Sequence, residues 1–228
     1  MLSPVVRPPG LVTGERLTVE EFLRRWEELP DLKNAELIDG VVYVSSPVSL
    51  DHGRLDWRII WWLSQYAYAT PGCDGGSDST WLMSGSAPQP DVYLRILPSH
   101  GGQSGSERSF GAGAPELAVE ISVTSADLDL GPKMALYQRA GVREYITVEQ
   151  FGHRMIWRVL ENAAYAAQTL PPDGIFRSRV FPGLWLDVEA FWADDGKKML
   201  AALNTGLSSE DHRQFVERLA LRSNPVPT

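Results

Sequence analysis

The fold is decided by the stretch PELAVEISVTSADLDLGPKMALYQRAGVREYITVE, residues 115–149. Its first part, 116–122, alternates apolar and polar residues as a half-buried strand does. Pro132 then opens a predicted helix, Gly141 closes it, and 143–149 has the composition of a second strand. A strand, a helix and a strand in this order form a βαβ crossover, so the two strands are predicted to be parallel neighbours.

Upstream of this unit, the chain predicts a helix followed by a hairpin. Thr18 and Glu21 form a capping box, and apolar residues recur at helical spacing from there until Pro30. Asp39-Gly40 lies between Glu36-Leu37-Ile38 and the apolar run 41–44, which is the signal of a two-residue β-hairpin.

The next segment predicts a second helix and two strands. Asp51 is expected to cap a helix that ends near residue 71 at the cluster PGCDGG, which is predicted to be a loop. Strands are predicted at 78–84 and 90–97. The stretch 98–115 is rich in Gly and Ser and is predicted to be a mobile loop between two core strands.

The remaining chain predicts a β-meander and two helical segments. The meander strands are expected within 153–160, 162–170 and 175–181, and the helices near 187–203 and 208–222. The domain organisation that we expect is a mobile lead-in over 1–17, an α/β domain over 18–192 and a C-terminal helical extension over 193–228.

Composition narrows the class of protein. The chain has 228 residues, 43% of them hydrophobic, and no stretch near the ~20 apolar residues of a membrane span. The N-terminus lacks the features of a signal peptide, so we expect a cytoplasmic protein. Cys73 is the single cysteine, which excludes an internal disulfide framework and a cysteine zinc site.

The charge balance is acidic. Lys and Arg number 21 against 29 Asp and Glu, which gives a net charge of −8, whereas dedicated nucleic-acid binders usually carry a basic face. An acidic enzyme can still act on DNA when a local basic cleft and a bound metal supply positive charge.

Two carboxylates are placed where strands can bring them together. Asp91 starts a strand directly after Pro90, and Glu120 lies on the polar face of 116–122. Hard oxygen ligands of this kind suit one Mg²⁺ or Mn²⁺ that keeps its other positions for water and phosphate. Taken singly, an Asp after Pro or a Glu in a strand is usually a solvated or turn-capping residue.

Lys133 strengthens the prediction of a site. It falls in the first turn of the predicted helix, where the helix dipole disfavours a cation by roughly 0.3–1 kcal/mol. Neighbouring carboxylates would hold it there, and its ammonium could orient a hydroxide and stabilise charge on a phosphorane. The alternative is a solvated surface lysine.

At these residues the chain resembles the Uma-type family of restriction endonuclease-like proteins, a domain of unknown function in the PD-(D/E)XK nuclease superfamily. The resemblance runs from about Thr18 to Trp192. It is carried by six segments in order: ELIDG (36–40), a helix opening with His52, PDVYL (90–94), ELAVEIS (116–122), DLGPK (129–133) and LYQRAGVREY (136–145).

The resemblance implies a restriction endonuclease-like mixed β-sheet core flanked by helices, with a migrated catalytic lysine. Ser122 occupies the usual lysine position, and Lys133 matches the migrated one. Carried over by position, the implied metal ligands are Asp91 and Glu120, and Glu36 would bind metal through water or orient Lys133. His52 and Tyr137 match positions that line the pocket. The run Ser122-Val123-Thr124-Ser125 departs from the family pattern by lacking a proline.

Three functions are compatible with these residues. The first is a Mg²⁺- or Mn²⁺-dependent endodeoxyribonuclease that cuts DNA, with a homodimer expected if both strands are cut. The second is a non-catalytic binding module on a nuclease scaffold, suggested by the acidic charge and by aromatic clusters at 57–62 and 185–192. The third is a hydrolase built on Ser122, His52 and an Asp, which lacks a G-x-S-x-G elbow.

Overall fold

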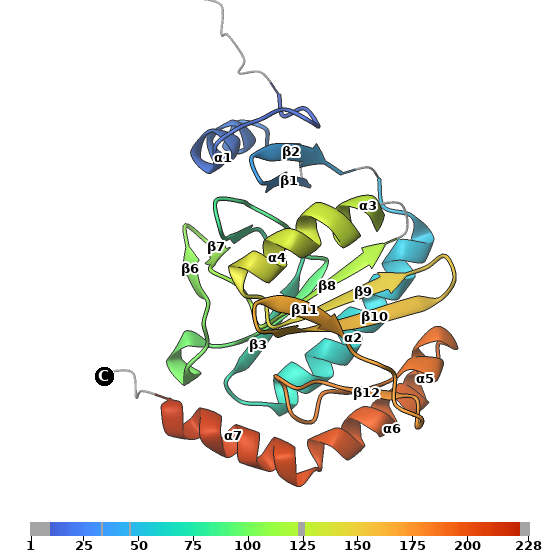
Figure 1. Ribbon diagram of the computed structural model, residues 1–228. Coiled ribbons are helices and arrows are strands. Elements are labelled where there is room, and N and C mark those ends of the chain that lie inside the picture. The colour runs from blue at the N-terminus through green and yellow to red at the C-terminus, as the bar shows by residue number, and fades with distance from the viewer. Residues whose placement is uncertain (1–9, 33, 46, 123–125, 224–228) are drawn as a thin grey trace, which may run out of the picture.

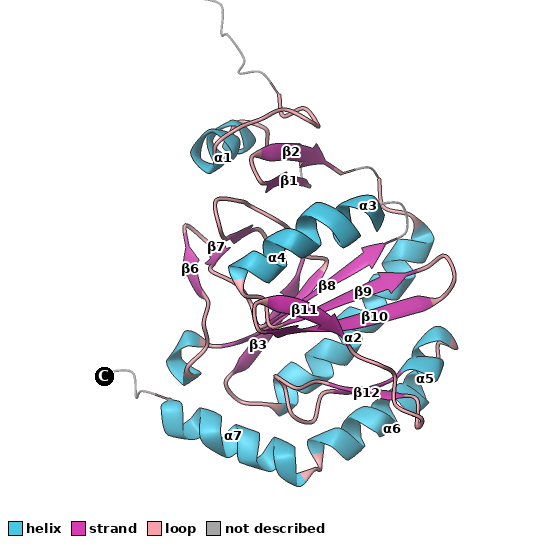
Figure 2. Cartoon of the chain, in the orientation of Figure 1, coloured by secondary structure: helices cyan, strands magenta, loops and turns pink. Residues whose placement is uncertain are grey.

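The computed structural model describes residues 10–32, 34–45, 47–122 and 126–223. Its centre is a six-stranded mixed sheet in the order β11-β10-β9-β8-β5-β3. The strands are β3 (Cys73–Ser77), β5 (Val92–Ile96), β8 (Leu117–Ser122), β9 (Glu144–Glu149), β10 (Arg154–Glu161) and β11 (Ala164–Ala167). Figure 1 shows helix α4 (Met134–Ala140) and helix α2 (Leu50–Ala69) on opposite faces of this sheet, and Figure 2 shows the resulting helix–sheet–helix layers. The predicted α/β class is confirmed.

The βαβ crossover forms as predicted. β8 and β9 are parallel, with Leu117 opposite Glu144, and every other neighbouring pair in the sheet is antiparallel. Gly141 ends α4 with φ of 88°, the left-handed conformation that glycine adopts without steric cost.

The start of the crossover helix differs from the prediction. Helical structure begins at α3 (Ala126–Leu128), continues through a π-helical turn η2 (Asp129–Lys133) and then enters α4, so Pro132 lies inside the helix. A proline ring clashes with the carbonyl group four residues earlier in a regular α-helix, and a wider turn relieves that clash. Because η2 precedes α4, Lys133 lies about two turns into the helical segment and not in its first turn.

The two sheet faces contact different cores. Leu117, Val119 and Ile121 share one face, as the alternation predicted, and they pack with α2 and with the C-terminal helices. Ala118 faces the opposite way and packs with Leu136 of α4. Polar residues at even positions of β8 therefore project from the α4 side of the sheet.

Strand β3 lies where the sequence predicts a loop. Cys73 pairs with Ile96, and the strand continues antiparallel to β5 as far as Ser77. A Cβ atom added at Gly75 would lie 2.9 Å from the Tyr93 carbonyl oxygen, and a Cβ atom added at Gly76 would lie 2.8 Å from the Tyr93 hydroxyl oxygen. The two glycines thus permit close strand approach at the sheet edge while carrying no apolar pattern that would indicate a strand.

The stretch 98–115 is ordered, contrary to the expectation of a mobile loop. It contains a 3₁₀ turn η1 (Pro98–His100) and the strands β6 (Gly105–Glu107) and β7 (Phe110–Ala112), which form a small sheet with β4 (Trp81–Leu82). The buried Glu116 carboxylate accepts hydrogen bonds from the N–H groups of Ile96 and Gln103, at 2.9 and 3.0 Å, and so fastens the segment at its base.

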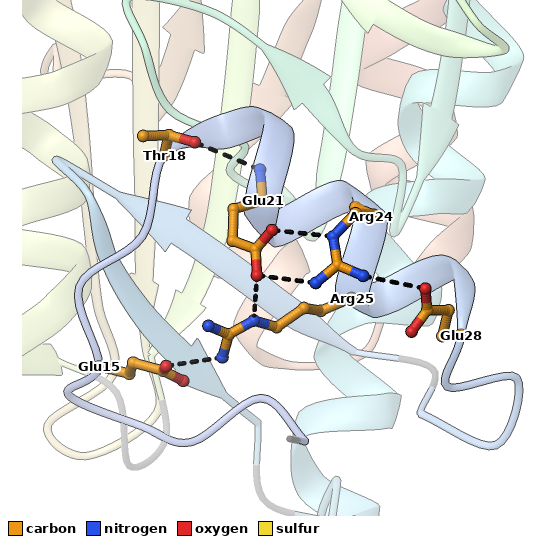
Figure 3. A network of polar contacts seen from close by, with 6 residues as sticks. All are labelled: Glu15, Thr18, Glu21, Arg24, Arg25 and Glu28. Atoms are coloured by element: carbon orange, nitrogen blue, oxygen red, sulfur yellow. Dashed lines mark hydrogen bonds and ion pairs between the residues drawn. The ribbon is translucent and has the colours of Figure 1, made fainter. Parts of the chain in front are cut away.

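The N-terminal helix and hairpin form a separate small core. Helix α1 (Val19–Glu27) packs through Phe22 and Leu23 against β1 (Ala35–Ile38) and β2 (Val41–Val44). The two hairpin turn residues both have positive φ, which confirms the predicted turn. The N-cap hydrogen bond from the Glu21 N–H to the Thr18 hydroxyl also forms, at 3.2 Å, but the Glu21 carboxylate pairs with arginines of the helix instead of closing the capping box (Figure 3).

Three further predictions are corrected at helix and strand ends. Ser49 caps α2 in place of Asp51, because its hydroxyl accepts from the His52 N–H at 3.2 Å. β10 and β11 form the predicted hairpin, but β12 (Ile175–Arg177) leaves the sheet and pairs with β13 (Trp185–Asp187). The first C-terminal segment is split into two helices. The C-terminal helices are α5 (Val188–Trp192), α6 (Gly196–Leu207) and α7 (Glu210–Arg222).

The C-terminal helices cover the α2 side of the molecule (Figure 1). Met199, Leu203, Phe215 and Leu219 enter the same core as α2 and the sheet. Within the described part of the chain, no helix combines the length and apolar character needed to cross a membrane.

Candidate active site

Asp91 and Glu120 lie opposite each other on neighbouring antiparallel strands. Val92 pairs with Val119, so one further step along the register places Asp91 across from Glu120. Side chains at directly opposite positions have Cβ atoms roughly 4.5–5.5 Å apart. Asp91 Oδ2 accepts a hydrogen bond of 2.6 Å from the Ile121 N–H, which holds this carboxylate against β8.

Lys133 joins two carboxylates that come from different parts of the chain. Its Nζ lies 2.8 Å from Oε1 of Glu36 and 2.8 Å from Oε1 of Glu120, and it donates to the Gln89 carbonyl oxygen at 3.2 Å. The Lys133 side chain is only 3% exposed. Burial alone would lower its pKa, but the charges of Glu120 and Glu36 outweigh burial and hold the pKa of Lys133 well above its usual value. The carboxylates therefore keep a buried ammonium charged.

The hairpin supplies Glu36 to a site that otherwise belongs to the central sheet. Glu36 Oε1 also accepts a hydrogen bond of 2.6 Å from the Gln89 N–H. Burial raises the pKa of Glu36 and that of Glu120, while the ammonium of Lys133 opposes the rise. Two carboxylates and one ammonium in this buried group leave an excess of negative charge.

Tyr137 of α4 holds Glu120 from the helix side. Its hydroxyl donates to Glu120 Oε1 at 2.7 Å, and both side chains are buried. Burial and the nearby Glu120 charge raise the pKa of Tyr137 well above its usual value, so the phenol keeps its proton and remains a donor. All described polar contacts of the Glu120 side chain fall on Oε1.

His52 and Ser122 have different surroundings. His52 Nε2 lies 3.6 Å from Asp91 Oδ1, and this contact raises the pKa of His52. The buried Ser122 hydroxyl donates instead to Asp129 Oδ2 at 2.8 Å. Among the described contacts none joins Ser122 to His52, so the pair required by a serine hydrolase is not formed. Residues 123–125, where the sequence departs from the family pattern, lie outside the described residues.

Glu36, His52, Asp91, Glu120 and Lys133 line one cavity of about 320 Å³, whereas Tyr137 and Ser122, which were predicted to line the pocket, are not part of its lining. The charged side chains of its lining are those of Glu36, Asp78, Asp91, Glu120, Asp129 and Lys133, and His52 also lines it. Most of the uncharged lining residues come from the hairpin, which also supplies Glu36, and from the segment that follows it. Neither Trp57 nor Trp62 of the aromatic cluster lines this cavity: Trp57 is 70% exposed on α2, and Trp62 is fully buried.

Sequence reasoning missed two acidic residues beside this cavity. Burial, and then the charges of Asp91 and Asp78, raise the pKa of Asp56 to about 7. Its Oδ1 is buried and has no hydrogen-bond partner among the described residues. Burial and the charge of Asp91 also raise the pKa of Asp78. Asp56 follows His52 by four residues in α2, a spacing that places both on one helix face and that could have indicated it.

Gln89 is a third contributor that the sequence did not reveal. It acts through its backbone, since its N–H donates to Glu36 and its carbonyl accepts from Lys133. Backbone N–H and carbonyl groups are common to nearly all residue types, so the sequence gives no sign of such a contribution. Pro88 and Pro90 flank Gln89, and proline restricts the residue before it to extended conformations.

The donors at this site fit a hard cation held by few protein ligands. Within the described part of the chain, no group of three or more His, Cys, Asp or Glu side chains is arranged to hold a metal. Asp91 and Glu120 are the available pair, because both line the cavity and no described hydrogen bond falls on Glu120 Oε2. Mg²⁺ is usually held by one or two carboxylates while it keeps several waters.

Comparison with known proteins places this chain in a family. A solved structure with a similar fold is described as a "putative nuclease belonging to DUF820" from Anabaena variabilis ATCC 29413. It has a TM-score of 0.61 and 12% sequence identity, and the match covers 78% of this chain and 98% of that one. No curated protein matches the chain. Residues 19–189 match the profile of the Uma2 family, described as "Putative restriction endonuclease", and the chain therefore belongs to the Uma2 family.

Proposed function

We propose that this protein is a metal-dependent nuclease that hydrolyses DNA phosphodiester bonds. The observation that carries the proposal is the position of Lys133 Nζ, 2.8 Å from both Glu36 Oε1 and Glu120 Oε1, in a cavity that Asp91 also lines. Burying charged groups costs free energy, and apolar side chains of similar size would often make the fold equally stable. Stability alone therefore does not explain a buried lysine between two carboxylates, which favours a functional role. Membership of the Uma2 family supports the same activity.

Asp91 and Glu120 are the residues that would hold Mg²⁺ or Mn²⁺. When bound, such an ion polarises a phosphoryl oxygen and acidifies a water. Tyr137 fixes Glu120 from α4, and the Ile121 N–H fixes Asp91 from β8. These contacts hold both carboxylates in place before substrate arrives, which lowers the reorganisation needed during the reaction.

Lys133 contributes a fixed positive charge at the reacting phosphate. Its three N–H groups meet three acceptors, and the contact with the Gln89 carbonyl, at 3.2 Å, is the longest. A phosphate oxygen or the attacking water would replace this contact. Glu36 then retains the ammonium in position while charge develops on the phosphorus oxygens.

The test is cleavage of DNA by the purified protein with Mg²⁺ or Mn²⁺. Asp91→Asn and Lys133→Ala should each abolish cleavage, and Lys197→Ala, at an exposed position of α6, should not. Equal cleavage by all four proteins would assign the activity to a contaminant. Cutting both strands of a duplex would favour a two-fold dimer, which sedimentation measures.

A non-catalytic binding module is the second candidate. The observation that favours it is that Glu36, Glu120 and the Gln89 carbonyl already occupy every donor of Lys133. Titration with Mn²⁺ separates the two. Saturable binding that Glu120→Gln weakens supports the enzyme, and absence of binding by the folded wild-type protein supports the module.

A further inference from the structure

The lining of the active-site cavity has two parts that differ in chemistry. The charged part has five carboxylates, Lys133 and His52. The uncharged part, which we call the uncharged wall, includes Asn34, Tyr43, Val44, Pro47 and Val48. Val48 is 61% exposed, so its side chain is accessible from solvent.

Tyr43 connects the uncharged wall with the lysine. In the β1–β2 hairpin Tyr43 lies directly opposite Glu36, so the two side chains project from the same face of the hairpin. Glu36 binds Lys133. An aromatic ring therefore lies beside the group that we assign to the reacting phosphate. Figure 1 shows this hairpin on the α4 side of the sheet.

The uncharged wall matches the chemistry of a nucleobase. A base has flat apolar faces and a polar edge, so it stacks on aromatic and aliphatic side chains and forms hydrogen bonds at its edge. Tyr43, Val44 and Val48 provide the apolar surface. The Asn34 amide carries both donors and an acceptor, and no hydrogen bond to this side chain is found among the described residues.

The same lining does not suit an intact duplex. Proteins hold a duplex mainly through Lys and Arg contacts with its phosphates. Of the described residues that line the cavity, Lys133 is the one Lys or Arg, and it is buried against three acceptors. A base within a duplex is also stacked on its neighbours and reaches a protein cavity only after it is extruded.

We propose that the hairpin wall binds an unpaired nucleobase on Tyr43, so that the substrate is single-stranded DNA or DNA with an unpaired nucleotide at the cut site. The inference rests on the proposed function in assigning the phosphodiester to the charged lining residues. It adds the strand state of the substrate and a binding role for Tyr43 and Asn34. Cutting one strand in this way does not require a two-fold dimer.

The first experiment measures binding without cleavage. Fluorescein-labelled oligothymidine and an abasic strand of the same length are titrated with protein in Ca²⁺ in place of Mg²⁺, and gels verify that the strands stay intact. Wild type should bind oligothymidine more tightly. Tyr43→Ala should weaken that binding roughly 5- to 150-fold, the range measured for loss of base stacking, and should leave abasic-strand binding unchanged.

Matched variants separate stacking from folding. Tyr43→Phe keeps the ring and should bind as wild type does. Tyr68→Ala removes a tyrosine that is 89% exposed on α2 and outside this cavity, so it should also bind normally. Because Tyr43 also packs against core residues, Val48→Ser provides a second variant at an exposed position, and it should weaken only oligothymidine binding.

The second experiment compares cleavage of a single strand, its duplex and a duplex with one mismatch, in Mg²⁺. The expected order of kcat/KM is single strand, then mismatch, then duplex. Faster cleavage of the perfect duplex, or equal binding of thymidine and abasic strands, overturns the inference while the nuclease proposal stands. Base-dependent binding lost in Tyr43→Ala without cleavage of any strand overturns the nuclease proposal and retains the base-binding wall.

Discussion

Lys133 Nζ lies 2.8 Å from Glu120 Oε1, and the two side chains are 3% and 2% exposed. One comes from the π-helical turn η2 and the other from strand β8. Removing either member of such a pair leaves an uncompensated charge in a place that water hardly reaches. Stability and activity therefore both depend on this contact.

Replacing Lys133 by methionine should destabilise the protein in a pH-dependent way. At pH 8 the free energy of unfolding should fall by about 3–5 kcal/mol, because Glu36 and Glu120 are left buried without their partner. Burial already raises the pKa of both carboxyl groups. They can therefore take up protons in the folded variant at pH 5, and the loss should be smaller there. Urea unfolding at the two pH values measures the difference, and Lys197→Met should show neither effect.

Tyr137→Phe should separate activity from stability. The change removes the 2.7 Å hydrogen bond to Glu120 Oε1 and should lower the free energy of unfolding by about 1.5–3 kcal/mol. Cleavage or Mn²⁺ affinity should fall roughly 10- to 100-fold, the usual cost of losing a group that orients a metal ligand.

The matched control for this variant is Tyr165→Phe. Its hydroxyl donates to the Val142 carbonyl at 2.9 Å and not to a carboxylate of the site. It should lower stability and leave cleavage and Mn²⁺ affinity intact. Equal loss of cleavage in both variants would show that Tyr137 acts only through stability.

Asp56→Asn should stabilise the metal-free protein at alkaline pH. The pKa of Asp56 rises from 3.8 to about 7, first through burial and then through the charges of Asp91 and Asp78. The folded state therefore binds more protons than the unfolded state between these values, and stability falls as pH rises through that window. The variant should gain about 1–2 kcal/mol at pH 8, a figure reduced for the partial exposure of the group, and little at pH 4.

Thermal unfolding in EDTA at the two pH values measures the effect of Asp56→Asn. Asp31→Asn is the control, because Asp31 is exposed beyond the end of α1. A gain that is the same at pH 4 and pH 8 would contradict the assigned charge repulsion.

Glu116→Ala should release the segment between β5 and β8. The Glu116 carboxylate accepts from two backbone N–H groups, those of Ile96 and Gln103. Their loss should cost about 2–4 kcal/mol and expose 97–115 to limited proteolysis. Glu107→Ala, on the exposed strand β6, should remain resistant. Resistance of Glu116→Ala would show that the small sheet with β4 suffices to hold the segment.

Features set by short-range patterns could be predicted from the sequence. Asp39-Gly40 determines the hairpin locally, through two residues that tolerate positive φ, and both have it in the structure. The alternation in 117–121 predicted that Leu117, Val119 and Ile121 share one face, because successive side chains of a strand point to opposite sides, and these three residues pack in one core. The crossover followed from the order of these elements.

Features set by tertiary contacts could not be predicted. β3 forms because Gly75 and Gly76 permit close approach to Tyr93, and glycine carries no periodic signal. The segment 98–115 is ordered by Glu116, whose partners are backbone groups. The helix-dipole argument for Lys133 does not apply, since η2 places it inside the helical segment, and the family resemblance indicates this lysine independently of that argument. Its burial follows from Glu36 and Glu120 instead.

The separate core of α1 and the β1–β2 hairpin has a consequence for the dynamics of the site. Phe22, Leu23 and Val42 form a core within this unit, and Ile38 and Tyr43 join it to the core beside α4. If these two contacts are released, the unit opens by local unfolding while the central sheet stays intact. Opening would withdraw Glu36 and break one of the three contacts of Lys133. Amide hydrogens of 35–44 should then exchange faster than those of 117–122. Lys133 would keep all three contacts only in molecules in which this unit is closed. The fraction of closed molecules would therefore limit the fraction that can catalyse the reaction.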